Sequence, residues 1–219
     1  REPMGLTSEP DSEDFKKVGE VFDRAIGELR AAGAEIIDPV VIPDLNTLLA
    51  TRTRSIEDDD ASYELYFKGG KTPFPTRADA MASPLFADVT NSVRRRWFAN
   101  SSDERQLDYL RARETLMTNI LKVMADHRLD AIVHKAVEHQ PTLIKDGVNP
   151  PFVDQKGAPH LNTFLIFVPS IVVPAGFTRD NLPAGITFLG RPYSDARMVQ
   201  LAYAYEQATN HRRPPSTVP

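Results

Sequence analysis

The stretch from residue 168 to residue 215 constrains the fold most, because it encodes two strands and a helix in close succession. Ser170–Val173 and Ile186–Leu189 are short apolar runs rich in β-branched residues. Pro174 closes the first run and Gly190 the second. Apolar runs of this length between turn-forming residues predict two strands.

A polar turn separates the two runs, and Asp180 or Asn181 can adopt a left-handed backbone there at low steric cost. We therefore expect a hairpin. Beyond it, Ser194 stands where it can cap a helix whose apolar residues recur at helical spacing. The helix is expected to pack on the sheet through Leu201 and Tyr205, which gives a module of strand, turn, strand and helix.

Three sequence blocks in this region have a recognisable pattern: PAGF at 174–177, LPAGITFLGRP at 182–192, and AYAYEQAT followed by HRRPP in 202–215. Together they resemble the C-terminal signature of the amidase signature family. A further block, VFDRAIGELRAAGAEIIDPVVIPDL at 21–45, resembles the helix and strand that follow the catalytic segment in those enzymes.

The resemblance implies an α/β fold, namely the C-terminal portion of the amidase signature fold, with a mixed β-sheet covered by α-helices. Residues 1–219 are then expected to form a single domain, the C-terminal part of an amidase signature domain. The family hydrolyses an amide C–N bond with a serine nucleophile, a second serine and a lysine. Those residues are expected upstream, in a Gly/Ser-rich stretch that this sequence lacks.

Composition narrows the classes of partner and compartment. The net charge is −4 and no strong basic patch is evident, which argues against nucleic acid and an anionic membrane surface as partners. The chain has no cysteine, and no apolar run approaches the length of a membrane span. We expect a soluble protein; a cytoplasmic location is favoured over a secreted one, with the compartment left open.

The chain opens with neither an initiator methionine nor a signal-like apolar region, so we expect part of a longer polypeptide. The missing N-terminal half, or another chain, is then expected to cover the sheet.

The other expected elements follow from apolar periodicity and from Pro and Gly breaks. They are a helix capped by Asp11 and ending at Gly33, an edge strand Glu35–Ile42, helical pieces within 45–68, a loop Thr72–Ser83, a short helix Asp88–Phe98, a helix from Ser101 to about Asp126, and a strand Asp130–Val133. Ser101 and Ser102 belong to a capping box that opens the long helix, and no glycine-rich loop surrounds them.

The segment Glu138–Pro159 is irregular and rich in proline, and its length suggests that it forms a wall of the substrate channel. Arg95 and Arg96 resemble a basic block near the substrate pocket in a glutamine-hydrolysing branch of the family, although a solvated face explains them too. His160 is a candidate for the channel mouth. Asn162 and Phe164 lie in the apolar run before Pro169; Phe164 favours an apolar acyl or aryl group if it faces the channel, and core burial is the alternative.

No metal, cofactor or catalytic residue is expected in this chain. The acidic run Glu57–Asp60 lacks the glycine-punctuated loop of a calcium site, and the five histidines show no metal-ligand spacing. Lys135 and Lys145 have no serine at a useful local spacing. The sequence thus predicts a part of a serine-dependent amidase that acts on a small-molecule amide. The alternative is a catalytically silent fragment or pseudoenzyme that serves as a binding or structural module.

Overall fold

The computed structural model describes residues 3–5, 7–53, 59–67, 70–89, 102–159, 161 and 168–215. The chain divides into two compact units. The first comprises Arg1–Thr51, Arg111–Pro141 and Gln155–Pro219, and the second comprises Arg52–Leu110 and Thr142–Asp154. The expected single-domain organisation stays a prediction.

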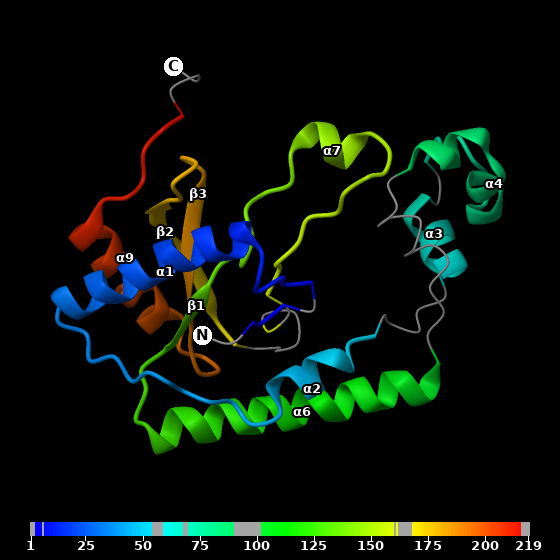
Figure 1. Cartoon of the computed structure of the whole chain (residues 1–219). Coiled ribbons are helices and arrows are strands. Elements are labelled where there is room, and N and C mark those ends of the chain that lie inside the picture. Colours follow the sequence, from blue (N-terminus) through cyan, green and yellow to red (C-terminus); the bar gives the residue numbers. More distant parts are fainter. Residues whose placement is uncertain are drawn as a thin grey trace. The chain divides into compact units, whose positions relative to one another are not determined.

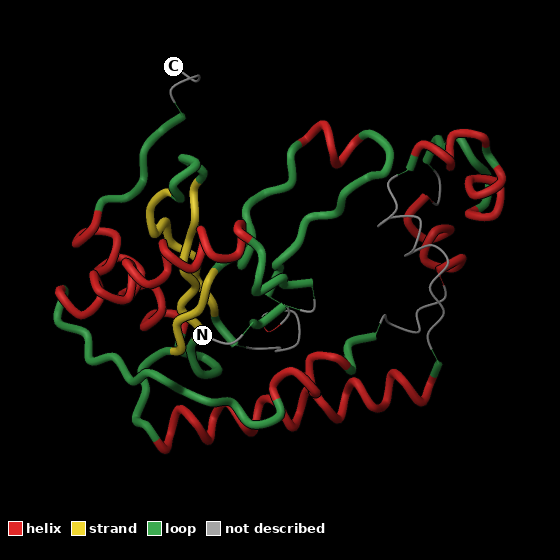
Figure 2. Tube along the Cα trace, viewed as in Figure 1, coloured by secondary structure: helices red, strands yellow, loops and turns green. Residues whose placement is uncertain are grey.

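The first unit holds all the strands that the structure describes (Figures 1 and 2). Its elements are α1 (Glu13–Ala31), α2 (Leu45–Ala50), β1 (Ile132–Lys135), β2 (Ser170–Phe177), β3 (Pro183–Leu189) and α9 (Asp195–Thr209). The second unit holds α3 (Asp59–Phe67), α4 (Arg77–Ala82), the 3₁₀ helix η1 (Pro84–Asp88) and α7 (Ile144–Val148). Residues of α6 (Asp103–Asp126) fall in both units.

The predicted hairpin is confirmed. β2 and β3 pair antiparallel, and β1 pairs antiparallel with the other edge of β3, so the order of the sheet is β1-β3-β2. Asn181 in the connecting turn has φ 63°, the left-handed conformation expected there. β2 continues past Pro174 through an irregularity between Pro174 and Gly176. It is therefore longer than the predicted strand Ser170–Val173.

One face of the sheet packs into a hydrophobic cluster with two helices. Val173 of β2, Ile186 and Phe188 of β3, and Tyr205 of α9 are all buried in one cluster with the apolar stripe of α1. α1 and α9 therefore cover the same face of the sheet. The predicted packing of α9 on the sheet through Leu201 and Tyr205 is confirmed. Strand side chains alternate between faces, so every second residue of each strand reaches this core.

Helix ends show where local sequence signals compete. α1 is capped by Ser12, whose Oγ accepts a hydrogen bond from the amide of Phe15 at 3.2 Å, so the predicted cap at Asp11 was one residue early. Ser102 caps α6 by accepting a hydrogen bond from the amide of Arg105 at 3.3 Å, whereas Ser101, which opens the predicted capping box with Glu104, lies outside the described residues. Ser194 does occupy the N-cap position of α9, but its hydroxyl donates to the carbonyl of Arg191 instead of accepting from the helix.

The strand predicted at Glu35–Ile42 is wrong, because these residues form no regular element. A strand needs a ladder partner, and none of the described strands pairs with this segment. Pro39 and Pro43 also remove amide donors that a ladder would use.

The second unit corrects a further prediction. The expected loop Thr72–Ser83 contains α4, which Thr76 opens with a capping box to Asp79. Arg77 of α4 forms an ion pair with Asp60 of α3, with 3.0 Å between Nη1 and Oδ1. Asp88 ends η1, and the rest of the predicted helix Asp88–Phe98 is outside the described residues apart from Val89. None of the described helices combines the length and apolar character needed to cross a bilayer.

Candidate functional site

The five residues predicted to contact substrate lie outside the described part of the chain. They are Arg95, Arg96, His160, Asn162 and Phe164. Their roles stay predictions, and the site described below is built from other residues.

A cluster of buried polar side chains begins where β1 ends. His134, Lys135, Glu138 and Gln140 are all buried, although charged residues and glutamine are ordinarily exposed. They are carried by the last two residues of β1 and by the loop that follows it. Buried polar groups are costly unless partners satisfy them, so each must be accounted for by its contacts.

Glu138 is the centre of this cluster, with a side chain only 1% exposed. Its two carboxylate oxygens each lie 3.0 Å from the amide nitrogen of Met4, and Ser8 donates its hydroxyl to Oε2. The backbone amide of Glu138 donates to the carbonyl of Gly157 at 2.8 Å. Glu138 therefore joins three segments of the first unit that are far apart in sequence.

Lys135 faces the same carboxylate. Its Nζ lies 3.9 Å from Oε1 of Glu138 and 3.7 Å from the centre of the Phe15 ring, an arrangement that favours a cation. Buried ion pairs offset the cost of desolvating both charges only where further hydrogen bonds complete them, and Met4 and Ser8 supply these to Glu138.

Gln140 is the centre of a second group of hydrogen bonds, beside that of Glu138. Its Nε2 donates to Asp14 at 3.0 Å and to Asp180 at 2.9 Å, while its Oε1 accepts from Thr178 at 2.7 Å. Lys17 completes this group with a 2.6 Å ion pair to Asp180, and its hydrogen bond lowers the pKa of Asp180. The loop after β1 is thus fastened both to the start of α1 and to the hairpin.

The chemistry of the Ser8, Glu138 and Lys135 group is that of a structural clamp. A serine nucleophile needs a base that accepts its proton and backbone donors that stabilise an oxyanion. Here the carboxylate that accepts from Ser8 also binds the amide of Met4 and lies beside an ammonium. Among the described residues, no group of three His, Asp or Glu side chains is placed to hold a metal ion.

Sequence reasoning noted Lys135 but not Glu138, Gln140 or Ser8. Ser8 lies 130 positions from Glu138 and Asp14 lies 126 from Gln140, so no local spacing reveals either contact. The only local signal was a run of polar residues directly after a strand, which is equally typical of a solvated loop.

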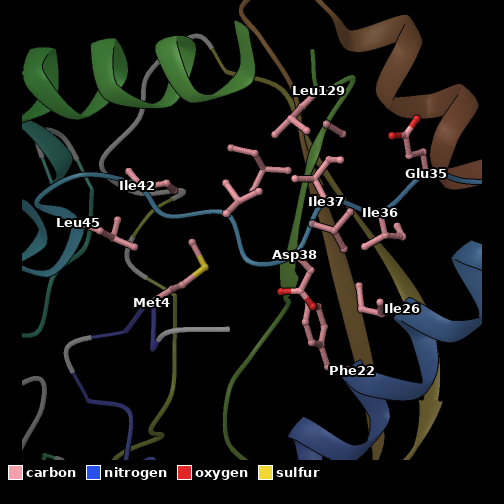
Figure 3. Close-up of a pocket in the computed structure, with 14 residues that line it drawn as sticks. Met4, Phe22, Ile26, Glu35, Ile36, Ile37, Asp38, Ile42, Leu45 and Leu129 are labelled. Carbon is pink, nitrogen blue, oxygen red and sulfur yellow. The ribbon is translucent and has the colours of Figure 1, made fainter. Parts of the chain in front are cut away.

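An apolar cavity of about 150 Å³ lies beside β1 (Figure 3). It is lined by β1 and the residues before it, by the segment after α1, by Phe22 and Ile26 of α1, and by Met4. Glu35 and Asp38 are the charged residues among those that line it. A wider hollow of about 730 Å³ shares Glu35–Ile37, Leu129, Ala131 and Val133 with it, so the two adjoin.

The segment Glu138–Pro159 contains no described element longer than α7, as predicted. None of its described residues lines either of these two hollows. Its expected role as a channel wall stays a prediction.

Comparison with known proteins identifies the family. The amidase family model matches residues 8–199. A probable amidase of Arabidopsis thaliana is 26% identical over 92% of this chain. A glutamyl-tRNA(Gln) amidotransferase subunit of Halothermothrix orenii is 25% identical over 94% of it. This chain spans 38% and 46% of those two relatives respectively.

The fold agrees with the sequence match. The peptide amidase of Stenotrophomonas maltophilia has a TM-score of 0.57 to this structure, with 28% identity. The similarity covers 90% of this chain and 41% of that enzyme. A family match over most of the sequence, and a matching fold, lead to one conclusion: the chain belongs to the amidase family, with the mixed α/β fold of the amidase signature enzymes.

Proposed function

We propose that this chain is part of a serine-dependent amidase that hydrolyses an amide C–N bond, and that the nucleophilic serine, the second serine and the lysine lie outside these 219 residues. The observation that carries the proposal is that the family match covers most of this chain, whereas this chain covers less than half of the relatives. The family match takes in residues 8–199, yet the chain spans only 38% of one full-length relative and 41% of a solved peptide amidase.

Four of the described serines support this division of labour. Acyl transfer needs a nucleophile, a proton relay and oxyanion donors at one place. Ser8 is committed to the Glu138 carboxylate, Ser12 and Ser102 cap helices, and Ser194 bonds a backbone carbonyl. These residues stabilise the scaffold, and the chemistry is assigned to a segment elsewhere.

The role of this chain in the complete enzyme is scaffold and channel wall. The loop after β1, fixed by Glu138 and Gln140, keeps the neighbouring backbone rigid. Arg95, Arg96, His160, Asn162 and Phe164 are the residues proposed to contact a small-molecule amide. The two compact units are proposed to belong to one amidase domain, whose remaining part or another chain covers the sheet.

The test uses the protein produced from the complete reading frame that encodes these residues. It should hydrolyse members of a panel of aliphatic, aryl and peptide amides, and the activity should be lost when a serine of its Gly/Ser-rich segment is changed to alanine. Ser8→Ala is the matched control, because a clamp residue should leave kcat within about threefold of the parent value.

Two outcomes would overturn the proposal. One is a folded full-length protein without a Gly/Ser-rich serine pair and a lysine, which would favour the silent binding module. The other is turnover that survives every change in that segment but is abolished by Ser8→Ala.

A further inference from the structure

The buried carboxylate of Glu138 holds the segment that runs from residue 1 toward α1. Both of its oxygens lie 3.0 Å from the amide nitrogen of Met4, and Oε2 also accepts a hydrogen bond from Ser8. Met4 lies 134 positions from Glu138 in the sequence. The contact therefore joins the first described residues of the chain to the loop after β1.

Residues later in the chain hold the same segment at further points. The amide of Gly157 donates to the hydroxyl of Thr7 at 3.2 Å. Gly5 packs against Ala158 so closely that a Cβ atom at Gly5 would lie 2.7 Å from the Ala158 carbonyl oxygen. The carbonyl of Gly157 in turn accepts from the amide of Glu138 at 2.8 Å. The segment that Glu138 holds is thus fixed by two stretches that are themselves bonded to each other.

The use of a charged acceptor at this place distinguishes the contact from ordinary packing. A backbone amide is a neutral donor, which a neutral carbonyl oxygen would satisfy without burying a charge. A hydrogen bond to an ionised acceptor is roughly twice as strong. Glu138 and Lys135 are both nearly excluded from water, and a buried ion pair of this kind is better suited to fixing one conformation than to raising stability. The contact therefore favours a role in placing the Met4 backbone.

The placement of this backbone bears on the reaction because the catalytic segment is expected upstream of residue 1. A chain that leaves that segment enters the described residues through Met4. A misplacement of about 1 Å at the reacting groups can lower a rate about 100-fold, even when the altered residue is far from the chemistry. A shift of the Met4 backbone would be transmitted to the segment that precedes it.

We propose that Glu138 is a positioning residue of the amidase. It acts through the Met4 backbone, which it holds in the path that places the upstream catalytic segment, and not through contact with substrate. This inference rests on the proposed function, because only a nucleophile upstream of residue 1 can be placed in this way. Loss of the contact should lower kcat and leave KM nearly unchanged.

The test compares three replacements of Glu138 in the complete protein, with the amide that it hydrolyses fastest. Glu138→Gln keeps the length of the side chain and one acceptor oxygen, so kcat should stay within about threefold of the parent value. Glu138→Asp keeps the charge but is one methylene shorter, and Glu138→Ala has no acceptor. Both should lower kcat about tenfold or more, with KM within about twofold.

Two controls separate positioning from a general loss of stability. Leu116→Ala opens a cavity in α6 at a residue that is 0% exposed, and it leaves Met4 untouched. Ser8→Ala removes one donor to Glu138 but keeps the Met4 contact. All variants are assayed at a temperature at which circular dichroism shows them folded, and both controls should keep kcat within about threefold.

Two further measurements follow the proposed cause. Amide hydrogen exchange at Met4 should be faster in Glu138→Ala and Glu138→Asp than in the parent protein and in Leu116→Ala. The rate of labelling by a serine-directed fluorophosphonate should fall in parallel with kcat, since the probe reacts with the nucleophile itself.

Three results would overturn the proposal: equal losses of kcat in Glu138→Ala and Leu116→Ala, equal activity of Glu138→Asp and Glu138→Gln, or a rise in KM at unchanged kcat. The last would indicate contact with substrate. A complete parent protein that hydrolyses no amide would remove the proposed function and this inference with it. An active parent whose Glu138 variants all keep their kcat would remove this inference alone.

Discussion

At the scale of single residues, the buried pair of Glu138 and Lys135 is the most consequential contact of the loop after β1. Its carboxylate and ammonium lie 3.9 Å apart, and both side chains are almost fully removed from water. Such a pair contributes less than its Coulomb attraction suggests, but removal of one partner leaves the other charge buried.

Glu138→Ala should therefore lower the free energy of unfolding by about 3 kcal/mol. The variant removes the acceptor for Met4 and Ser8 together with the charge opposite Lys135. Urea denaturation followed by circular dichroism measures the change. Glu114→Ala, at an exposed position of α6, is the control and should stay within about 0.5 kcal/mol of the parent chain. A cost below about 1 kcal/mol for Glu138→Ala would show that the clamp does not stabilise the fold.

Because Tyr205 is buried, we expect the protein to lose stability at alkaline pH. Its ring is 1% exposed and its hydroxyl donates to Glu28 at 2.7 Å. Burial, and then Glu28, raise the pKa of Tyr205 above its ordinary value of 10.0. The stability that the buried Tyr205 hydroxyl contributes is complete below pH 10.0. It is lost as pH rises toward the folded-state pKa, because Tyr205 ionises first in the unfolded chain.

The parent chain should consequently lose unfolding free energy above pH 10.0 more steeply than Tyr205→Phe, which cannot ionise at this position. At neutral pH the same variant should be less stable by about 1 to 2 kcal/mol, since a hydrogen bond to a charged group is lost. Tyr203→Phe, at an exposed position of the same helix, serves as the control. Equal alkaline slopes for the parent and Tyr205→Phe would contradict the assignment.

At the scale of elements, the two serines at helix N-termini make a direct comparison. Ser12→Ala should cost about 1 kcal/mol, because Ser12 accepts from the amide of Phe15. Ser194→Ala should cost less than half of that, since the Ser194 hydroxyl caps no helix amide. Urea denaturation of both variants decides the matter. Equal costs would mean that the N-cap position matters more than the side-chain contact.

The elements with strong local signals were predictable from sequence. The hairpin followed from two β-branched runs around a polar turn, and α1 followed from an apolar stripe that ends before Gly33, which has φ 94°. The segment Glu35–Ile42 was not predictable in this way. Its composition is that of a strand, but a strand exists only with a partner, and sequence composition does not reveal whether a partner is present.

The candidate site was less predictable than the fold for a related reason. Glu138 and Gln140 become a clamp only because Met4, Ser8 and Asp14 contact the loop after β1. His211 gives a similar example, because its Nε2 lies 2.8 Å from Glu28 of α1, 183 positions away. Contacts between distant segments leave no periodic trace in sequence.

At the scale of the whole molecule, membership of the family does not by itself place the catalytic nucleophile in this chain. Residues 8–199 match the amidase family, and Ser8, Ser12 and Ser194 cap a helix or bind a carboxylate or carbonyl group. Function resides in a site and not in a fold, so a chain can carry the family's architecture without its nucleophile. We therefore expect these residues to support an amidase site without containing its nucleophile.

The most direct test of this expectation is labelling of the purified 219-residue chain with a serine-directed fluorophosphonate, read by intact mass. An activated serine reacts stoichiometrically with such a probe, whereas an ordinary hydroxyl does not. A known serine hydrolase treated in parallel establishes that the probe is reactive. We expect no adduct on this chain. A stoichiometric adduct that disappears in Ser8→Ala would contradict this, because the nucleophile would then lie in the Glu138 cluster.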